Sequence, residues 1–397
     1  LAEWPEAGPR LLWRVDGLGY GYSAPIITGG RIYLAGDVGD ELRIFALDTN
    51  GKRLWESGNG RSWKDPYPGA RASCTYSEGR LYHMNAHGRI ACLDAETGKE
   101  LWAVNVLDRF EGKNITWAIS ENVLVNENVV MVTPGGRKAF MAALDKKTGK
   151  TVWASEPLKL GPSENPRMQR LVRPVGETDP ASYGSPVLIR WQGKRLLITS
   201  SQRHFAGVDR DSGQLVWTRP FPTRYEVIPG TPLLVGDAVF MTAPDTDAGG
   251  LYRLKLTETG WDVDRVWRTE LDTCHGGWVL VDGLILGSWY RSERGWAAID
   301  AGTGQVLWKW KDIPKGSVIW ADDRCYCLGE DGTMVLLEAK RSGPVVKGRF
   351  RLVEQRVNDA WTHPVILDGR LYLRYHESLY CYDIRRQSGG ARSVQQN

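Results

Sequence analysis

The sequence predicts an all-β fold, an eight-bladed β-propeller in which each blade is a four-stranded antiparallel sheet. A motif that ends in tryptophan recurs along the chain, strand hairpins accompany its copies, and the chain begins with a strand that has no hairpin partner of its own. Because self-similarity at roughly 50 residues is typical of propellers and other repeat folds, the repeats decide the architecture.

Composition is that of an ordinary globular protein. The 397 residues are 42% hydrophobic and 25% charged, which excludes general disorder. A net charge of +4, without a run of like charges, does not indicate nucleic-acid binding. No apolar stretch approaches the length that spans a bilayer. The chain starts without a basic or apolar leader, and we expect a mature product after signal removal.

Five copies of the motif share one pattern, in which an apolar segment leads to Asp, then to Thr-Gly or a close variant, and then to Trp. These copies end at Trp55, Trp102, Trp153, Trp217 and Trp308. Two degenerate copies end at Trp267 and Phe350, and successive copies are 41 to 64 residues apart. So many copies exclude a chance match.

Each motif is predicted to supply the third and fourth strands of a blade and the turn between them. In that turn, Asp accepts hydrogen bonds from backbone amides, Thr adds a hydroxyl, and Gly adopts the positive φ that other residues resist. An apolar strand, a tight turn and a second strand precede the motifs, as in residues 23–36 with their Gly-Gly turn. Eight such hairpins occur, so hairpin and motif together make a four-stranded sheet.

The motif tryptophans are expected to lie on the outer strands and to pack against the neighbouring blade, with the indole N–H bonded to a backbone carbonyl. Full burial of one such side chain contributes about 4 to 6 kcal/mol as an upper bound. A single sheet cannot cover this surface. We therefore predict a structural role for these residues and not ligand stacking.

The two ends of the chain predict how the ring closes. The last unit begins at Trp361 and supplies three strands, whereas residues 10–15 form a lone strand with Trp13 at the outer-strand position. Pairing of both ends in the eighth blade removes an open sheet edge. We expect a single domain over residues 1–386 and a disordered tail over residues 387–397.

Six cysteines occur without a C-x-x-C pair, so no structural zinc site is predicted. Cys74 and Cys92 fall within one repeat. They are either bonded across its sheet or buried separately as free thiols, which is the commoner case. The cysteines alone leave the redox compartment open.

The motif Asp-x-x-Thr-Gly-Lys-x-x-Trp, at residues 94–102 and 145–153, resembles the tryptophan-docking motif of the pyrroloquinoline quinone (PQQ)-type β-propellers. The resemblance covers nearly the whole chain, and residues 21–37 are similar to those of an uncharacterised bacterial branch. This superfamily includes quinoprotein alcohol dehydrogenases and the non-enzymatic lipoprotein of the outer-membrane β-barrel assembly machinery. The resemblance therefore implies a fold and leaves the chemistry open.

The dehydrogenase branch implies a quinone in the central funnel, against a Trp floor, with calcium, a catalytic Asp and commonly a disulfide between adjacent cysteines. This chain departs from that pattern. Cys325 and Cys327 are separated by Tyr326, and the chain has no C-x-x-C-H haem site.

Ligand sites of propellers lie where the loops that lead into the innermost strands converge on the axis. The predicted cofactor- or ligand-binding residues of this funnel are Arg71, Trp117, Tyr183, His275, Trp361 and His363, with Tyr20, Tyr22, Tyr225 and Lys315 at equivalent positions. This lining lacks the clustered carboxylates that calcium prefers. Glu121, Asn122 and Asp359 are the candidate oxygen ligands for a calcium ion. We predict no metal site and no bound cofactor, with PQQ and calcium as the alternative.

His275 is the candidate catalytic residue. Two glycines follow it at the start of an inner strand. It is therefore either an acid, base or metal ligand in the funnel, or a hydrogen-bonded residue that plugs the channel.

An insertion over residues 155–182 accounts for the longest interval between motifs. Its Arg167, Arg170 and Arg173 are either partner-binding residues or part of a flexible surface loop.

Three functional hypotheses follow. The first is a non-catalytic, protein-binding scaffold, periplasmic or secreted, whose partner is another protein or protein complex. The second is a PQQ-dependent quinoprotein dehydrogenase of alcohols or sugars. The third, a carbohydrate- or polymer-binding propeller of the lectin-like kind, is suggested by exposed aromatic residues and ranks last.

Overall fold

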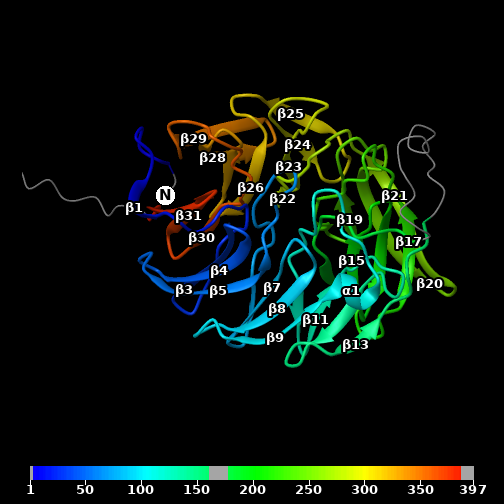
Figure 1. Ribbon diagram of the computed structural model, residues 1–397. Coiled ribbons are helices and arrows are strands. Elements are labelled where there is room, and N and C mark those ends of the chain that lie inside the picture. Colours follow the sequence, from blue (N-terminus) through cyan, green and yellow to red (C-terminus); the bar gives the residue numbers. More distant parts are fainter. Residues whose placement is uncertain (1–2, 161–177, 386–397) are drawn as a thin grey trace, which may run out of the picture.

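The computed structural model describes residues 3–160 and 178–385, and it confirms the predicted fold class. Eight four-stranded antiparallel sheets stand around a central axis (Figure 1). Seven sheets are formed by four consecutive strands, and the eighth combines both ends of the chain. We number the blades 1 to 8 by their innermost strands, β2, β6, β10, β14, β18, β22, β26 and β30.

Blades 1 to 4 consist of the strands β2 (Ile26–Thr28), β3 (Arg31–Val38), β4 (Glu41–Asp48) and β5 (Arg53–Arg61); β6 (Thr75–Ser77), β7 (Arg80–Met84), β8 (Arg89–Asp94) and β9 (Glu100–Asn105); β10 (Leu124–Asn126), β11 (Val129–Val132), β12 (Ala142–Asp145) and β13 (Thr151–Ala154); and β14 (Val187–Trp191), β15 (Lys194–Ser200), β16 (His204–Asp209) and β17 (Leu215–Pro220). Blades 5 to 8 consist of β18 (Leu233–Val235), β19 (Ala238–Met241), β20 (Gly250–Thr257) and β21 (Gly260–Arg268); β22 (Trp278–Val281), β23 (Leu284–Ser288), β24 (Trp296–Asp300) and β25 (Val306–Trp310); β26 (Gly316–Ala321), β27 (Arg324–Gly329), β28 (Thr333–Lys340) and β29 (Gly343–Arg351); and β30 (Val365–Leu367), β31 (Arg370–Tyr375), β32 (Ser378–Asp383) and β1 (Arg10–Val15).

The first strand of the chain closes the ring, as predicted. β1 pairs antiparallel with β32, with Arg10 opposite Asp383 and Val15 opposite Leu379, and Figure 1 shows the blue β1 beside the red strands of blade 8. Arg374 on β31 reinforces this closure. Its buried guanidinium donates hydrogen bonds to main-chain carbonyls of Gly19, Ser23, Ala35 and His376, at 2.6 to 3.0 Å. Three of these carbonyls belong to the chain around blade 1, so the bonds tie blade 8 to it.

The motif turn has the predicted chemistry. In blade 2, one carboxylate oxygen of Asp94 accepts hydrogen bonds from the amides of Glu96 and Thr97 and from the Thr97 hydroxyl, at 2.8 to 3.1 Å. Gly98 follows with a φ of 72°. Equivalent bonds recur at Asp145, Asp209 and Asp300.

A tryptophan of the preceding blade packs on such a turn. Trp55 of blade 1 donates from its indole nitrogen to the carbonyl of Ala95, at 3.3 Å. Its ring lies against Gly98, where an added Cβ would be 2.6 Å away, so glycine is required for space as well as for φ. Indole N–H groups also donate to carbonyls of the next blade at Trp13, Trp102, Trp153, Trp267 and Trp308.

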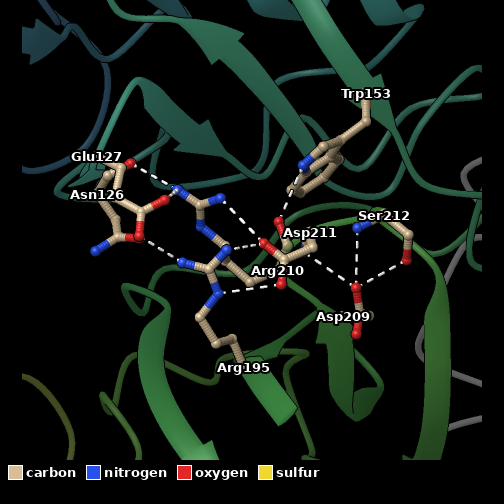
Figure 2. A network of polar contacts seen from close by, with 8 residues as sticks. All are labelled: Asn126, Glu127, Trp153, Arg195, Asp209, Arg210, Asp211 and Ser212. Atoms are coloured by element: carbon tan, nitrogen blue, oxygen red, sulfur yellow. Dashed lines mark hydrogen bonds and ion pairs between the residues drawn. The ribbon is translucent and has the colours of Figure 1, made fainter.

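Figure 2 shows this contact between blades 3 and 4. Trp153 donates to the carbonyl of Arg210, at 3.1 Å. Ion pairs join the same blades, because Glu127 contacts Arg195 at 2.5 Å and Arg210 at 3.1 Å, and Arg195 also pairs with Asp211. Partly exposed pairs of this kind contribute about 0 to 1 kcal/mol each. The indole and the apolar residues between the sheets therefore carry most of the attraction.

Trp217 of blade 4 departs from the prediction. Blade 5 lacks the Asp-x-x-Thr-Gly turn, because β20 and β21 stay paired as far as Thr257 and Gly260. The Trp217 indole lies instead over Gly207 of its own blade, with its ring 5.1 Å from that of Phe205. Its N–H has no hydrogen-bond partner in the part of the chain that the structure describes. The tryptophan thus needs a receiving turn in the next blade.

Cys74 and Cys92 are both buried and free, so they are separate thiols and are not bonded across the sheet. Arg167, Arg170 and Arg173, most of the predicted insertion and the predicted tail over residues 387–397 lie outside the described residues. Within the two described ranges, no helix has the length and apolar character needed to cross a membrane. α1 (Val106–Phe110) has five residues.

Candidate functional site

A cavity of about 680 Å³ lies where the loops that lead into the innermost strands converge. This volume falls in the range of small-molecule pockets, roughly 300 to 1,000 Å³. The six funnel residues predicted from the sequence all line it, namely Arg71, Trp117, Tyr183, His275, Trp361 and His363. Tyr22, Tyr225 and Lys315 line it too, whereas Tyr20 packs on the ring of His376. The structure brings these residues together, and their binding roles stay a prediction.

Equivalent residues just before the innermost strands form one side of the cavity. The amide of Ala24 donates to the Ser73 hydroxyl at 2.9 Å, and the amide of Ser73 donates to the Asn122 side-chain oxygen at 2.6 Å. The amide of Asn122 donates in turn to the Ser185 hydroxyl, at 3.0 Å. These bonds run from blade to blade, so four neighbouring blades present a connected polar belt to the cavity.

Trp361 is the centre of an aromatic cluster in the cavity lining. Its ring centroid lies 5.0 Å from that of Tyr22, 5.3 Å from that of Tyr67 and 4.3 Å from that of His275. The planes are tilted by 37° to 73°, so the rings present both faces and edges.

Arg71 holds the loop that carries Tyr67. Its guanidinium donates to the carbonyls of Gly69 at 2.6 Å, Tyr67 at 2.7 Å and Trp117 at 2.8 Å. Burial lowers the pKa of Arg71 to about 10, which leaves it protonated at neutral pH. Most N–H donors of Arg71 therefore bond main-chain carbonyls, and Arg71 positions Tyr67 and Trp117 in the cavity lining.

Glu330 lies beneath Trp361. It accepts a hydrogen bond from the indole nitrogen at 2.8 Å and lies 3.8 Å from the Lys315 ammonium. Burial raises the pKa of Glu330, and the charge of Lys315 opposes this shift. The other two carboxylates of the cavity also have cationic partners, with Asp245 3.2 Å from Arg291 and Asp359 paired with Arg356.

His275 is a neutral histidine at physiological pH. Burial, with the nearby charge of Lys315, lowers its pKa to about 4. Its Nε2 lies 4.0 Å from a Glu330 oxygen, beyond hydrogen-bond distance. The Nε2–H of His363 donates to the His275 carbonyl at 3.1 Å. The buried Nε2 has no hydrogen-bond partner among the described residues, and a neutral imidazole of this pKa does not suit a general acid at neutral pH.

The donor set of the cavity offers little to a metal ion. Within residues 3–160 and 178–385, no group of three or more His, Cys, Asp or Glu side chains is arranged to hold one. Asn122 and Asp359 line the cavity, but Glu121 is buried beside it and is not part of the lining. Cys274 also lines the cavity, and burial raises the pKa of its thiol to about 12.

Sequence reasoning missed cavity residues that come from the loops between second and third strands. Asp245, Tyr290 with Arg291, and Glu330 lie in such loops. Because antiparallel strands alternate in direction, these loops return to the face where the innermost strands begin. Asp272 fixes one of them, since its carboxylate accepts bonds from the amides of Tyr290 and Arg291, both at 2.8 Å. A search that included these loops would have found the residues.

Comparisons with known proteins support one family over most of the chain. The family model described as outer membrane protein assembly factor BamB matches residues 40–310. BamB of Yersinia pestis is 22% identical over 333 residues, which cover 80% of this chain and 75% of that protein. The crystal structure of BamB from Moraxella catarrhalis superposes with a TM-score of 0.65 and 15% identity, over 94% of this chain and 99% of the other.

Quinone-dependent dehydrogenases match as well. The quinohemoprotein alcohol dehydrogenase ADH IIB of Pseudomonas putida is 26% identical over 306 residues, which cover 69% of this chain and 39% of that enzyme. Two others match over shorter segments. The 1-butanol dehydrogenase (quinone) of Thauera butanivorans is 30% identical over 161 residues, or 38% of this chain, and the match covers 23% of that enzyme. For the alcohol dehydrogenase (quinone) of Acetobacter aceti the identity is 28%, and the match covers 33% of this chain and 19% of the enzyme subunit. The matches thus span between about a fifth and two fifths of the length of these enzymes. On its fold, its repeats and the match over residues 40–310, the chain belongs to the family of the outer membrane protein assembly factor BamB, among the PQQ-like β-propellers.

Proposed function

We propose that this chain is a non-catalytic, extracytoplasmic propeller that acts as a protein-binding scaffold. The observation that carries the proposal is the extent of the match to BamB, which covers 80% of this chain and 75% of that protein. One dehydrogenase match covers 69% of this chain but only 39% of that enzyme, and two others cover 33% and 38% of this chain. An assembly factor of the outer membrane works outside the cytoplasm with other proteins, and the proposal extends this setting to the chain.

Exposed apolar side chains on the cavity face support a docking role. Tyr67 is 54% exposed, Tyr225 is 46% exposed and Val357 is 79% exposed. The two tyrosines line the cavity, and Val357 lies two residues before the cavity residue Asp359. Tyrosine is enriched in protein–protein interfaces, where exposed rings provide rigid contact area.

The alternative function, a quinone dehydrogenase, fits the cavity residues poorly. Calcium prefers several carboxylate or carbonyl oxygens, but each cavity carboxylate already has a cationic or indole partner. Arg71, the cation beside Trp117, donates mainly to carbonyls of its own protein. The residues present do not fit a calcium-bound quinone, so we derive no catalytic step.

Capture of partners tests the scaffold role. The affinity-tagged chain is produced in its native organism and crosslinked to its partners in the cells, and captured proteins are identified by mass spectrometry. A variant with Tyr225→Ser and Val357→Ser should lose partners that the wild type retains. The matched control, Leu54→Ser with Val152→Ser, changes exposed apolar residues of outer strands and should retain them. Equal capture by both variants would remove this face from the proposal.

Two further experiments complete the test. Deletion of residues 161–177 asks whether Arg167, Arg170 and Arg173 contribute to capture, and we expect a loss of partner. Incubation of the purified chain with PQQ and calcium, followed by dye reduction with ethanol or glucose, should give no turnover. Turnover would contradict the non-catalytic assignment and favour the dehydrogenase.

A further inference from the structure

We propose that the central cavity binds a neutral, hydroxyl-rich ring compound, a mono- or disaccharide. The inference does not depend on the scaffold role, because it concerns a small ligand inside the cavity, although Tyr67 and Tyr225 belong to both the cavity lining and the exposed face. It rests on four features of the cavity: its charged groups that already have partners, its tilted aromatic rings, its belt of hydroxyl and amide groups, and the strained backbone that presents the rings.

The charged groups of the cavity already have partners. Asp245 pairs with Arg291, Glu330 lies beside Lys315, and Asp359 pairs with Arg356 from just outside the lining. The remaining cation, Arg71, directs hydrogen bonds to four main-chain carbonyls. A charged ligand would find no oppositely charged side chain that lacks partners, and it would lose its hydration, which is costly. A neutral ligand avoids this cost.

The aromatic rings surround the cavity and do not fill it. Trp361 with Tyr22 and Tyr67 forms one group, and Trp117 with Tyr183, 6.0 Å apart and tilted by 51°, forms another. Aromatic side chains offer an apolar face together with a polar tip. A pyranose ring has the matching character, because its C–H faces are apolar and its edge carries hydroxyls.

The polar belt supplies hydrogen-bond partners for such hydroxyls. The Ser73 and Ser185 hydroxyl oxygens each accept from a main-chain amide. Each hydroxyl therefore keeps its proton for donation. The side chain of Asn122 accepts through its oxygen, which leaves its NH₂ group to donate. Hydroxyls that donate and accept at once are the groups best matched to this set.

Backbone strain presents the rings. Of the thirteen non-glycine residues with positive φ in the described ranges, nine lie in two-residue hairpin turns or at the helix end. The other four are at the cavity: Tyr67 (59°), Asp245 (54°), Ala118 (68°) beside Trp117, and Glu226 (56°) beside Tyr225. Strained non-glycine residues cluster where a site requires a geometry that folding alone does not favour.

Direct binding measurements test the proposal. Calorimetry and tryptophan fluorescence are recorded on the purified full chain with glucose, galactose, maltose and cellobiose, and with tetramethylammonium chloride and sodium benzoate as charged probes. We expect saturable binding of at least one sugar and none of the charged probes. Failure of all four sugars would overturn the proposal, and saturable binding of a charged probe would overturn the assignment to a neutral ligand.

A pair of variants tests the location. Tyr67→Gly removes an exposed ring and relieves its positive φ, so it should raise the sugar Kd about tenfold without lowering the denaturation midpoint. Tyr76→Ala removes a ring that is 39% exposed on β6, away from the cavity lining, and should bind like the wild type. Unchanged affinity in Tyr67→Gly would overturn the location. Partner capture and sugar binding are measured separately, and the capture variant changes Tyr225 and Val357 and not Tyr67, so each proposal can fail alone.

Discussion

Replacement of Glu121 by glutamine should remove a pH-dependent loss of stability. Glu121 precedes β10 and is 2% exposed. One carboxylate oxygen accepts from the amide of Thr133 at 2.9 Å, and the other has no partner among the described residues. Burial raises the pKa of Glu121 to about 8, against 4.5 for an ordinary glutamate. The folded protein therefore holds a proton that the unfolded chain releases.

The size of the effect follows from these two pKa values. Because the folded pKa is raised, the stability due to this proton is fully present below pH 4.5 and is lost as the pH rises through 8. A shift of this size corresponds to roughly 5 kcal/mol in total, of which about 3 kcal/mol is lost between pH 6 and pH 9. Glutamine keeps an acceptor for the Thr133 amide but cannot ionise.

Urea denaturation at pH 6 and pH 9 measures the effect. Relative to the wild type, Glu121→Gln should gain about 3 kcal/mol of unfolding free energy between the two pH values. Glu258→Gln, an exposed glutamate in the turn between β20 and β21, is the matched control and should gain none. Parallel wild-type and Glu121→Gln stabilities at the two pH values would refute a buried, neutral carboxyl.

Two further changes test the ring itself. Arg374→Met should lower the unfolding free energy by about 3 to 5 kcal/mol, because four carbonyls lose a charged donor; removal of the cost of burying the guanidinium offsets part of this loss. The exposed Arg349→Met should change the unfolding free energy by less than about 0.5 kcal/mol. Equal effects of the two substitutions would contradict the role of Arg374 in closure. Trp102→Phe should cost about 1 kcal/mol more than Trp217→Phe, because only Trp102 bonds a carbonyl of the next blade; equal denaturation midpoints would remove the N–H bond from the account.

Most of the fold was predictable because the repeated residues act locally. Asp94 and Thr97 fix their turn through bonds within four residues, so the sequence of one motif is sufficient to recognise it. The closure was predictable from strand counting, since β1 lacked a hairpin partner. The orientation of Trp217 was not predictable, because it depends on the absence of an Asp-x-x-Thr-Gly turn in blade 5. Residues Thr257 and Gly260, more than thirty residues later in the chain, stay paired there.

The candidate site was predictable only in part. Residues at the starts of innermost strands, such as Arg71 and His275, could be placed because every blade has one such position. Residues of irregular loops, such as Tyr290 and Glu330, could not be placed, since no periodic pattern aligns them. Their partners are also non-local: Glu330 bonds the indole of Trp361, from the next blade.

The repeated motif residues and the cavity residues lie at opposite ends of the strands. The Asp–Gly turns join third to fourth strands, on the same side as the inner hairpin turns, and direct bonds connect them, as from the amide of Ala95 to the carbonyl of Gly79. The cavity lies at the other end, where the innermost strands begin. Among non-glycine residues, positive φ at the motif end occurs in regular two-residue hairpin turns, whereas at the cavity end it also occurs in irregular loops, at residues such as Tyr67 and Asp245. Recurrence of the motif therefore conveys architecture, and the chemistry must be sought in residues that do not repeat.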